Sequence, residues 1–349
     1  MLSVSSKSPV AASVRRAPPV VAADKSPIPT LWLDTSVGIK LAKIRRGENL
    51  NEIEVKRGLQ FRDLIVDLVK NGKLLCPEAG QEEEYEAERI DSEIFAEFAR
   101  LSGGARMNHR LVIQDTQIYR AMEAYCLGNE EIKLPWRIYF HEDPFRAIQR
   151  EKGRRLIVSV LDGPDSELVI RRRAAKQDIL RHTEKLRQEL VSKGQSYDSQ
   201  LELELTSLGT ALARLLASFI EKLRAGTSDA YDYMGVLGLL QYSDRWKKFG
   251  RNPRNLFEFL TSEYVKSLPI VKISSQLYAD LVTGNQPILS GDSMDVELLS
   301  MAVPLAQFVL TDKKMENRIK RLGIDVEWNT KVFSMSTVDG LFIELAALR

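Results

Sequence analysis

Residues 30–34, Thr-Leu-Trp-Leu-Asp, decide the fold, and residues 308–312, Phe-Val-Leu-Thr-Asp, repeat the pattern near the other end of the chain. Each is a short apolar run that ends in an acid, Asp34 or Asp312, and is bounded by polar or turn-forming residues. Such a run is typical of a strand buried on both faces. We therefore expect two buried strands that each end in an aspartate.

The residues after the first strand predict a parallel sheet. Residues 52–70 carry apolar side chains at helical spacing, and Gly72 follows as the expected stop signal. Residues 73–77, Lys-Leu-Leu-Cys-Pro, form a second short apolar run. Strand, helix and strand in this order are the signature of a βαβ unit.

The C-terminal region continues the α/β pattern. A helix is expected from Asp292 until Pro304 breaks it, and a second one over residues 313–322 with Gly323 as its stop. Residues 332–334 are expected to form the last strand. Both ends of the chain thus belong to the α/β class.

The middle of the chain differs in character. Residues 99–285 are dominated by helical patterns, with a few strands expected at 136–140, 156–160 and 167–170. We interpret this region as a mostly helical insertion between two halves, 29–98 and 286–349, of one domain. Residues 1–28, rich in Ser, Ala, Val and Pro, are expected to be a disordered tail.

Composition narrows the function. Lys+Arg 50 against Asp+Glu 48 gives a formal net charge of +2, so any nucleic-acid surface must be local. Two cysteines without CxxC spacing and three widely separated histidines disfavour a zinc site or a Ser-His-Asp triad. No apolar run is long enough for a membrane span, so we expect a cytoplasmic protein, with an organelle transit peptide as the minority option.

Acidic residues gather where the expected strands end. In an open parallel sheet the functional crevice lies at the carboxyl ends of the strands, where Asp34 and Asp312 would meet. Asp292 and Asp295 share one face at a helix start. One of the three acids at 82–84 opens the helix after the second strand.

Clustered carboxylates need a cation. At about 4 Å each pair repels by roughly 1 kcal/mol in water and by more near a protein surface. Mg²⁺ or Mn²⁺ relieves this repulsion and can activate a water for attack on a phosphodiester. Each acid also has a structural interpretation, as a helix cap for Asp34, Asp292 and Asp312 or as a solvated helix face for residues 81–88.

The order of these motifs resembles the PIN-domain family of metal-dependent ribonucleases. The resemblance rests on Leu-Asp34-Thr-Ser, on Pro77 followed by Glu83, on Asp295-Val-Glu-Leu-Leu, and on Val-Leu-Thr-Asp312. The stretch from Gly291 to Asp312 looks especially like a large bacterial subgroup. The resemblance covers residues 30–98 and 286–349, and it implies a three-layer α/β/α domain with a parallel central sheet.

The resemblance also implies the site and the activity. The Mg²⁺ or Mn²⁺ ligands would be Asp34, Asp295 and Asp312, with Glu83 completing the acidic cluster and Asp292 as an accessory. The substrate would be single-stranded RNA cut by an endoribonuclease, plausibly a toxin or defence effector. The basic residues after Asp312 could hold phosphates, or could form an ordinary solvated face; they are Lys313, Lys314 and Arg318.

Other functions stay open. The chain could be a non-catalytic PIN-like scaffold that binds nucleic acid or a regulatory protein partner, and its oligomeric state is open. A haloacid-dehalogenase-type phosphatase is disfavoured, because that class needs a second Asp where Ser36 stands. Neither a GxxxxGK[ST] nor a GxGxxG motif is present, which disfavours nucleotide-driven and dinucleotide enzymes.

Overall fold

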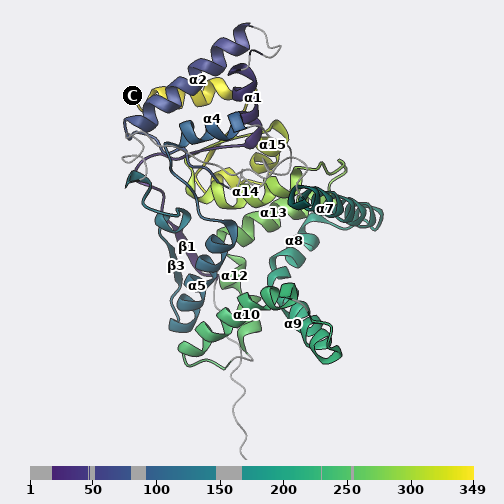
Figure 1. Ribbon diagram of the computed structural model, residues 1–349. Helices are drawn as coiled ribbons and strands as arrows, with labels where there is room; N and C mark the ends of the chain where they lie inside the picture. Colours follow the sequence, from purple (N-terminus) through teal and green to yellow (C-terminus); the bar gives the residue numbers. More distant parts are fainter. Residues whose placement is uncertain are drawn as a thin grey trace, which may run out of the picture.

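A computed structural model describes residues 18–45, 47, 52–79, 92–146, 167–228, 230–252 and 255–349 of the chain (Figure 1). Glu83, the expected strand at 156–160 and residues 1–17 lie outside the described residues. The described part is a mixed α/β structure in which helices predominate over short parallel strands.

Three parallel strands lie side by side in the order β2-β4-β5. They are β2 (Leu31–Leu33), β4 (Phe308–Thr311) and β5 (Lys331–Ser334), and they confirm the strands expected at these places. Every residue of β2 and of β4 is buried, as expected for central strands that are covered on both faces. The two apolar runs from distant parts of the chain are therefore direct neighbours.

Isolated bridges continue the pairing beyond β2. Thr30 pairs with Leu75 and Glu78 with Arg106, both in parallel, and Met107 pairs with Phe140 in antiparallel fashion. The expected strand at 73–77 is thus reduced to a single bridge. Pro77 helps to explain this, because it has no N–H group to donate to a ladder.

A second, two-stranded parallel sheet corrects our expectation for the N-terminus. Strand β1 (Val20–Ala23) pairs along its whole length with β3 (Glu131–Leu134). The final third of the expected disordered tail at 1–28 is therefore ordered. A single sequence does not show this, because the strand depends on a partner more than 100 residues away.

Four helices pack together on one side of the larger sheet and lie at the top of Figure 1. Helix α2 occupies the predicted range, and Gly72 after it has a φ of +67°. Helices α1 and α4 approach closely at Gly38, where an added Cβ would lie 1.8 Å from Phe98 Cε2. The four helices are α1 (Thr35–Arg45), α2 (Glu52–Lys70), α4 (Ser92–Ser102) and α17 (Val338–Ala346).

A second group of helices lies below the sheet in Figure 1. Helix α14 (Asp292–Leu305) keeps Pro304 in its last turn and packs on α13 (Pro269–Thr283). Helix α15 (Lys313–Arg321) contacts β5, and Gly323 follows with a φ of +68°. These helix boundaries agree with the sequence patterns.

Two strands expected in the middle region are wrong. Residues 136–140 form the 3₁₀ helix η1 (Trp136–Tyr139), and residues 167–170 are the first turn of α7 (Glu167–Ser192). Short apolar runs do not distinguish a strand from a buried helical turn, and the run at 167 continues into good helix formers. The remaining helices are α5 (Arg110–Leu127), α8 (Tyr197–Leu205), α9 (Ser207–Ala225), α10 (Ala230–Lys248), α11 (Leu256–Leu260), α12 (Glu263–Lys266) and α16 (Ile324–Glu327).

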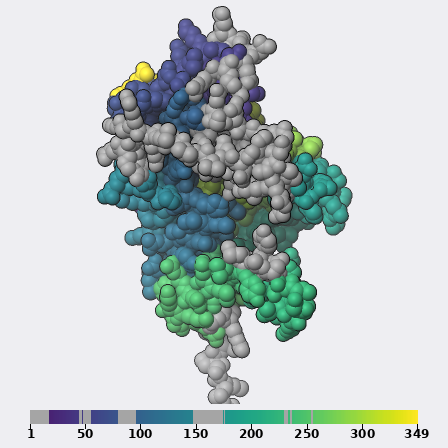
Figure 2. All heavy atoms as spheres, viewed as in Figure 1, coloured from purple at the N-terminus to yellow at the C-terminus, as the bar shows by residue number. Residues whose placement is uncertain are grey.

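One continuous hydrophobic core joins the middle region to the sheet. It contains Ile113 of α5 and Leu277 of α13 together with Leu299 of α14 and Val309 of β4. The region around α9 and α10 lies at the lower end of the molecule (Figure 2), and Tyr242 and Trp246 of α10 still belong to this core. Helices α5, α10 and α13 thus share their core with the α/β elements, whereas α7 packs on a smaller cluster of Leu281, Val282 and Ile288.

No single helix in the described ranges is long and apolar enough to cross a membrane. Helices α8 and α9, which meet at a bend of 53°, satisfy length and composition criteria only when they are taken together.

Candidate metal and active site

Asp34 lies at the carboxyl end of β2 and is held by its neighbours. Its side chain accepts hydrogen bonds from Ser36 N (2.7 Å, to Oδ1) and from Thr311 Oγ1 (3.3 Å, to Oδ2), and the residue is 7% exposed. Burial is the main reason that the pKa of Asp34 is raised, and the negative charge of Asp312 raises it further. The carboxylate of Asp312 is thus close enough to Asp34 for its charge to add to the effect of burial.

Asp312 lies at the carboxyl end of β4, the strand next to β2. Its Oδ1 accepts a hydrogen bond from Met315 N at 2.9 Å, so Asp312 is the N-cap of α15. The structural interpretation as a helix cap is therefore correct for this residue. A cap uses one carboxylate oxygen, and the same aspartate still places its charge beside Asp34.

Asp292 and Lys314 bind each other. Lys314 Nζ donates to Asp292 Oδ2 at 2.7 Å, and Leu289 N donates to the same oxygen at 2.8 Å. Asp292 is only 3% exposed. The pair fastens the start of α14 to the start of α15, which places both helix starts at the carboxyl edge of the sheet.

Asp295 lies one helical turn after Asp292 and is half-buried. Among the residues that the structure describes, no group of three or more Asp, Glu, His or Cys side chains is arranged to hold a metal ion. Glu83 is not among the described residues. The structure thus brings Asp34 and Asp312 together, and it does not show a complete four-acid cluster.

Glu316 is a buried acid that we did not predict. It is 1% exposed, and its carboxylate accepts hydrogen bonds from Lys313 Nζ (3.0 Å), Lys320 Nζ (2.7 Å) and Thr337 Oγ1 (3.1 Å). Burial alone would raise its pKa, but the hydrogen bonds from Lys320, Ser334, Lys313 and Thr337 outweigh burial and lower the pKa to about 2. The sequence signal that could have identified Glu316 is its spacing from Lys313 and Lys320, which lie three residues before and four residues after it on the same helix.

Arg318 lies in a buried ion pair. Its Nε donates to Asp280 Oδ2 at 2.7 Å, and Arg321 contacts the same carboxylate at 2.8 Å. The side chain of Arg318 is 8% exposed. This position favours a role in fastening α15 to α13 over the phosphate binding that we expected for Arg318.

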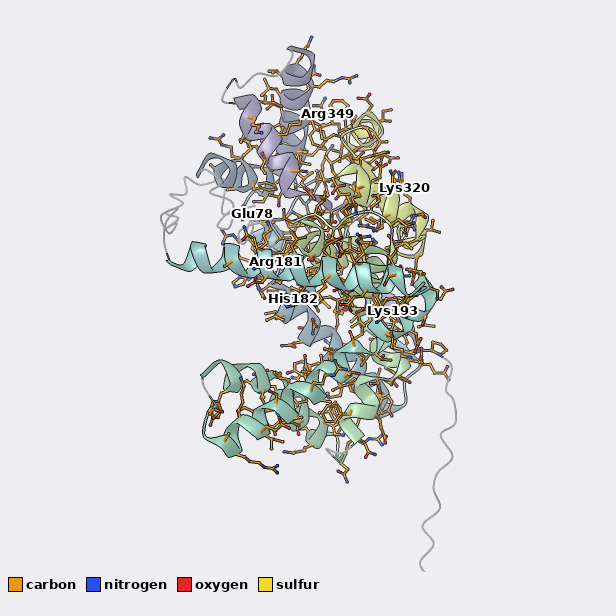
Figure 3. All side chains as sticks on the ribbon, turned by 90° about the vertical axis from the view of Figure 1, so that its right-hand side faces the viewer. Glu78, Arg181, His182, Lys193, Lys320 and Arg349 are labelled. Atoms are coloured by element: carbon orange, nitrogen blue, oxygen red, sulfur yellow. The ribbon has the colours of Figure 1, made fainter. Side chains whose placement is uncertain are left out.

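Lys313 has the most accessible cation of the three predicted phosphate-binding residues. Its side chain is 53% exposed, and its ammonium group donates to Glu316 at 3.0 Å. Figure 3 views the molecule from the side toward which α7 projects, with Lys320 of the same basic helix labelled above α7. Lys313 directly follows Asp312 in the chain and is therefore the most accessible of the three candidates for phosphate binding.

The fold and the site define a mixed α/β protein whose parallel sheet presents two neighbouring aspartates at its carboxyl edge. Comparisons with protein-family models, with curated proteins and with solved structures find no match to the chain. Functional inference therefore depends on the residues themselves.

Proposed function

We propose that the protein is a metal-dependent nuclease of the PIN-like type that hydrolyses phosphodiester bonds in RNA. The observation that carries the proposal is the convergence of Asp34 and Asp312 at the ends of adjacent parallel strands, where the charge of Asp312 helps to raise the pKa of Asp34. A crevice at the carboxyl ends of parallel strands is the usual place for a ligand in such sheets.

The arrangement of the elements supports a three-layer fold. Helices α1, α2, α4 and α17 lie on one side of the sheet and α13 and α14 on the other (Figure 1). The pairing runs in parallel from Arg106 through Glu78, Leu75 and Thr30 to β4 and β5. This parallel order, which ends at the antiparallel bridge between Met107 and Phe140, agrees with the parallel central sheet of the PIN-like proposal.

The two aspartates fit a hard divalent cation. Mg²⁺ is generally bound through one or two carboxylates and several waters, and it does not require a cage of protein ligands. When bound, such an ion activates a water and stabilises the leaving oxygen of a phosphodiester. Asp295 and Glu83 remain proposed further ligands, whereas the pairing of Asp292 with Lys314 favours a structural role for both.

The chain's own residues prepare the site for this chemistry. Ser36 N and Thr311 Oγ1 orient the carboxylate of Asp34, and Met315 N orients that of Asp312. Lys313, held by Glu316, would neutralise a phosphate of the substrate and position it beside the aspartates. Oriented carboxylates and one directed cation are suited to in-line displacement at phosphorus.

Asparagine variants test the proposal. Asp34→Asn and Asp312→Asn keep the oxygen that accepts from Ser36 N or Met315 N, so the fold should survive. We expect each variant to cut a fluorogenic single-stranded RNA at least about a hundredfold more slowly in Mn²⁺, since even changes to residues behind metal ligands cost about 10–100-fold. Asp244→Asn, an exposed acid on α10, is the matched control and should cut normally.

A scaffold without catalytic activity would give a different result. Such a protein would leave RNA intact in both Mg²⁺ and Mn²⁺, and Mn²⁺ would not raise its melting temperature. A bound ion, by contrast, stabilises by about 2.7 kcal/mol at a hundred times its dissociation constant. Intact RNA together with no metal-linked stabilisation in the wild-type chain would reject the nuclease proposal.

A further inference from the structure

A cavity of about 450 Å³ opens beside α14, the helix that carries Asp292 and Asp295. Its walls include Met294 and Glu297, which flank Asp295 on α14, and Glu78, which follows the segment paired with β2. Pockets for small ligands generally measure about 300–1,000 Å³. The cavity thus has room for a ligand the size of one nucleotide, whereas the apolar pocket between α1, α2 and α17 measures only about 250 Å³.

The floor of the cavity is apolar and rich in sulfur. Met107, Met294, Met301 and Leu298 line it, so three of the eight methionines in the chain lie at one cavity. Methionine is polarisable and adapts its shape, and its sulfur makes favourable contacts with aromatic rings. This floor suits a flat aromatic group.

Side chains that can donate hydrogen bonds line the same cavity. Arg106, Arg110, His109 and His141 line the cavity where α5 begins. Arginine is suited to phosphate recognition, because its planar guanidinium presents five N–H donors in a fixed fork. The cavity therefore combines an apolar surface with arginine and histidine side chains.

Carboxylates hold both arginines in place. Arg106 Nε lies 3.3 Å from Glu78 Oε2, and Arg110 Nη1 lies 3.1 Å from Glu297 Oε1. Glu78 is itself 8% exposed and accepts a hydrogen bond from Ser102 Oγ at 3.2 Å. The two glutamates balance the charge of the arginines, so recognition here depends on oriented donors more than on net charge. Ligand contacts fixed in advance cost less entropy on binding.

We propose that this cavity binds a nucleotide, with the base against the methionines and the phosphate on Arg106, Arg110 and His141. The choice of a nucleotide over other flat anions rests on the proposed function, because an RNA strand cut at the acidic edge would bring its neighbouring nucleotide to this cavity. The occupant is either a free mononucleotide or one unit of the strand, and both present the same chemistry.

Binding in the absence of metal tests the proposal. Full-length protein in EDTA is titrated with AMP, with adenosine, with inorganic phosphate and with a labelled single-stranded RNA tetramer. We expect AMP and RNA to bind saturably, and adenosine and phosphate each to bind at least tenfold more weakly, because each lacks half of the recognised chemistry. Equal affinity for AMP and for phosphate would overturn the proposal, because the floor would then contribute nothing.

Two variants assign binding to the cavity. Arg110→Gln removes the cation and leaves only Glu297, whose side chain is 43% exposed, so the variant should fold. Met294→Trp fills the floor without changing charge. Each should weaken AMP or RNA binding at least fivefold. Arg120→Gln is the matched control, because Arg120 lies on the same helix and contacts Glu123 at 3.2 Å in the same way; its affinity should not change.

The outcomes separate this inference from the proposed function. Asp34→Asn should keep nucleotide binding in EDTA while it loses RNA cleavage. If the wild type cuts no RNA but loses AMP binding in Arg110→Gln, the cavity is a site for free nucleotides and only the nuclease proposal fails. If Arg110→Gln and Met294→Trp lose the binding of RNA but keep the binding of AMP, the cavity binds one nucleotide of an RNA strand. If Arg110→Gln and Met294→Trp both bind AMP and RNA like the wild type, the cavity is not the site.

Discussion

At the scale of single residues, the carboxylates of this protein divide into those that the chain neutralises and those that it does not. Asp280 is paired with two arginines, and Glu316 with two lysines. Asp34 instead faces another acid, and its pKa is raised while that of Glu316 is lowered. A buried acid held beside a like charge costs stability, and such perturbed groups concentrate at functional sites.

Asp34 should therefore destabilise the metal-free protein near neutral pH. The pKa of Asp34 is higher in the folded chain than the ordinary value of 3.8, so the folded state binds this proton more tightly than the unfolded state does. The stability that the bound proton provides is fully present below about pH 4 and is lost as the pH rises through the folded-state pKa. In EDTA at pH 7.5 we expect Asp34→Asn to melt about 2 °C or more above the wild type. The difference should shrink as the pH falls toward 4.

Mn²⁺ should reverse this order, because the ion stabilises only the chain that retains the carboxylate. Differential scanning fluorimetry at pH 7.5 and at pH 4, with and without Mn²⁺, gives four melting temperatures for the wild type and four for Asp34→Asn. Asp244→Asn serves as the surface control, since the side chain of Asp244 is 72% exposed. A lower melting temperature for Asp34→Asn in EDTA would show that Asp34 is a stabilising cap and nothing more.

At the scale of secondary-structure elements, the close approach of α1 and α4 depends on a missing side chain. An added Cβ at Gly38 would lie 1.8 Å from Phe98 Cε2, and Phe98 is 3% exposed. We expect Gly38→Ala to lower the free energy of unfolding by about 1–3 kcal/mol, because the buried ring must move. Chemical denaturation of the metal-free protein measures the change.

Gly238 provides a matched control inside α10. It is also a helical glycine, but nothing lies within 4 Å of an added Cβ. Gly238→Ala should therefore raise the free energy of unfolding by up to about 1 kcal/mol through helix propensity alone. If both variants shift stability in the same direction, α1 and α4 do not meet as described.

Elements with a strong local signal could be predicted from the sequence, and elements that depend on distant partners could not. The 3.6-residue period and the stop at Gly72 defined α2, and the apolar runs ending in Asp34 and Asp312 defined β2 and β4. Strand β1 was missed because it pairs with β3, more than 100 residues away. The 3₁₀ helix η1 was missed because its aromatic residues are equally typical of a strand.

The same distinction holds for the candidate site. Asp34 and Asp312 could be placed together because the carboxyl ends of parallel strands meet by topology. The burial of Glu316 depends on Ser334 and Thr337, which come from the end of β5, and that of Glu78 depends on Ser102 and Arg106. A carboxylate in a polar stretch looks solvated until its partners are known, so both acids were missed.

At the scale of the whole molecule, the shared core decides how the chain unfolds. Ile113 of α5 and Leu277 of α13 belong to the same hydrophobic cluster as Val309 of β4. A domain interrupted by an independent insertion would have two cores and would unfold in two steps. The shared cluster predicts one cooperative unit that includes the sheet and both of these helices.

Hydrogen exchange at increasing urea concentrations tests this prediction without any substitution. Peptides from β4, α5 and α13 should lose protection at the same urea concentration, because their amides open only when the common core is lost. Helix α9 is an internal reference: only Gly209 is buried along its length, so its amides should exchange at lower urea. Earlier loss of protection in α5 and α13 than in β4 would mean that the middle region unfolds on its own, and that the continuous core does not act as one unit.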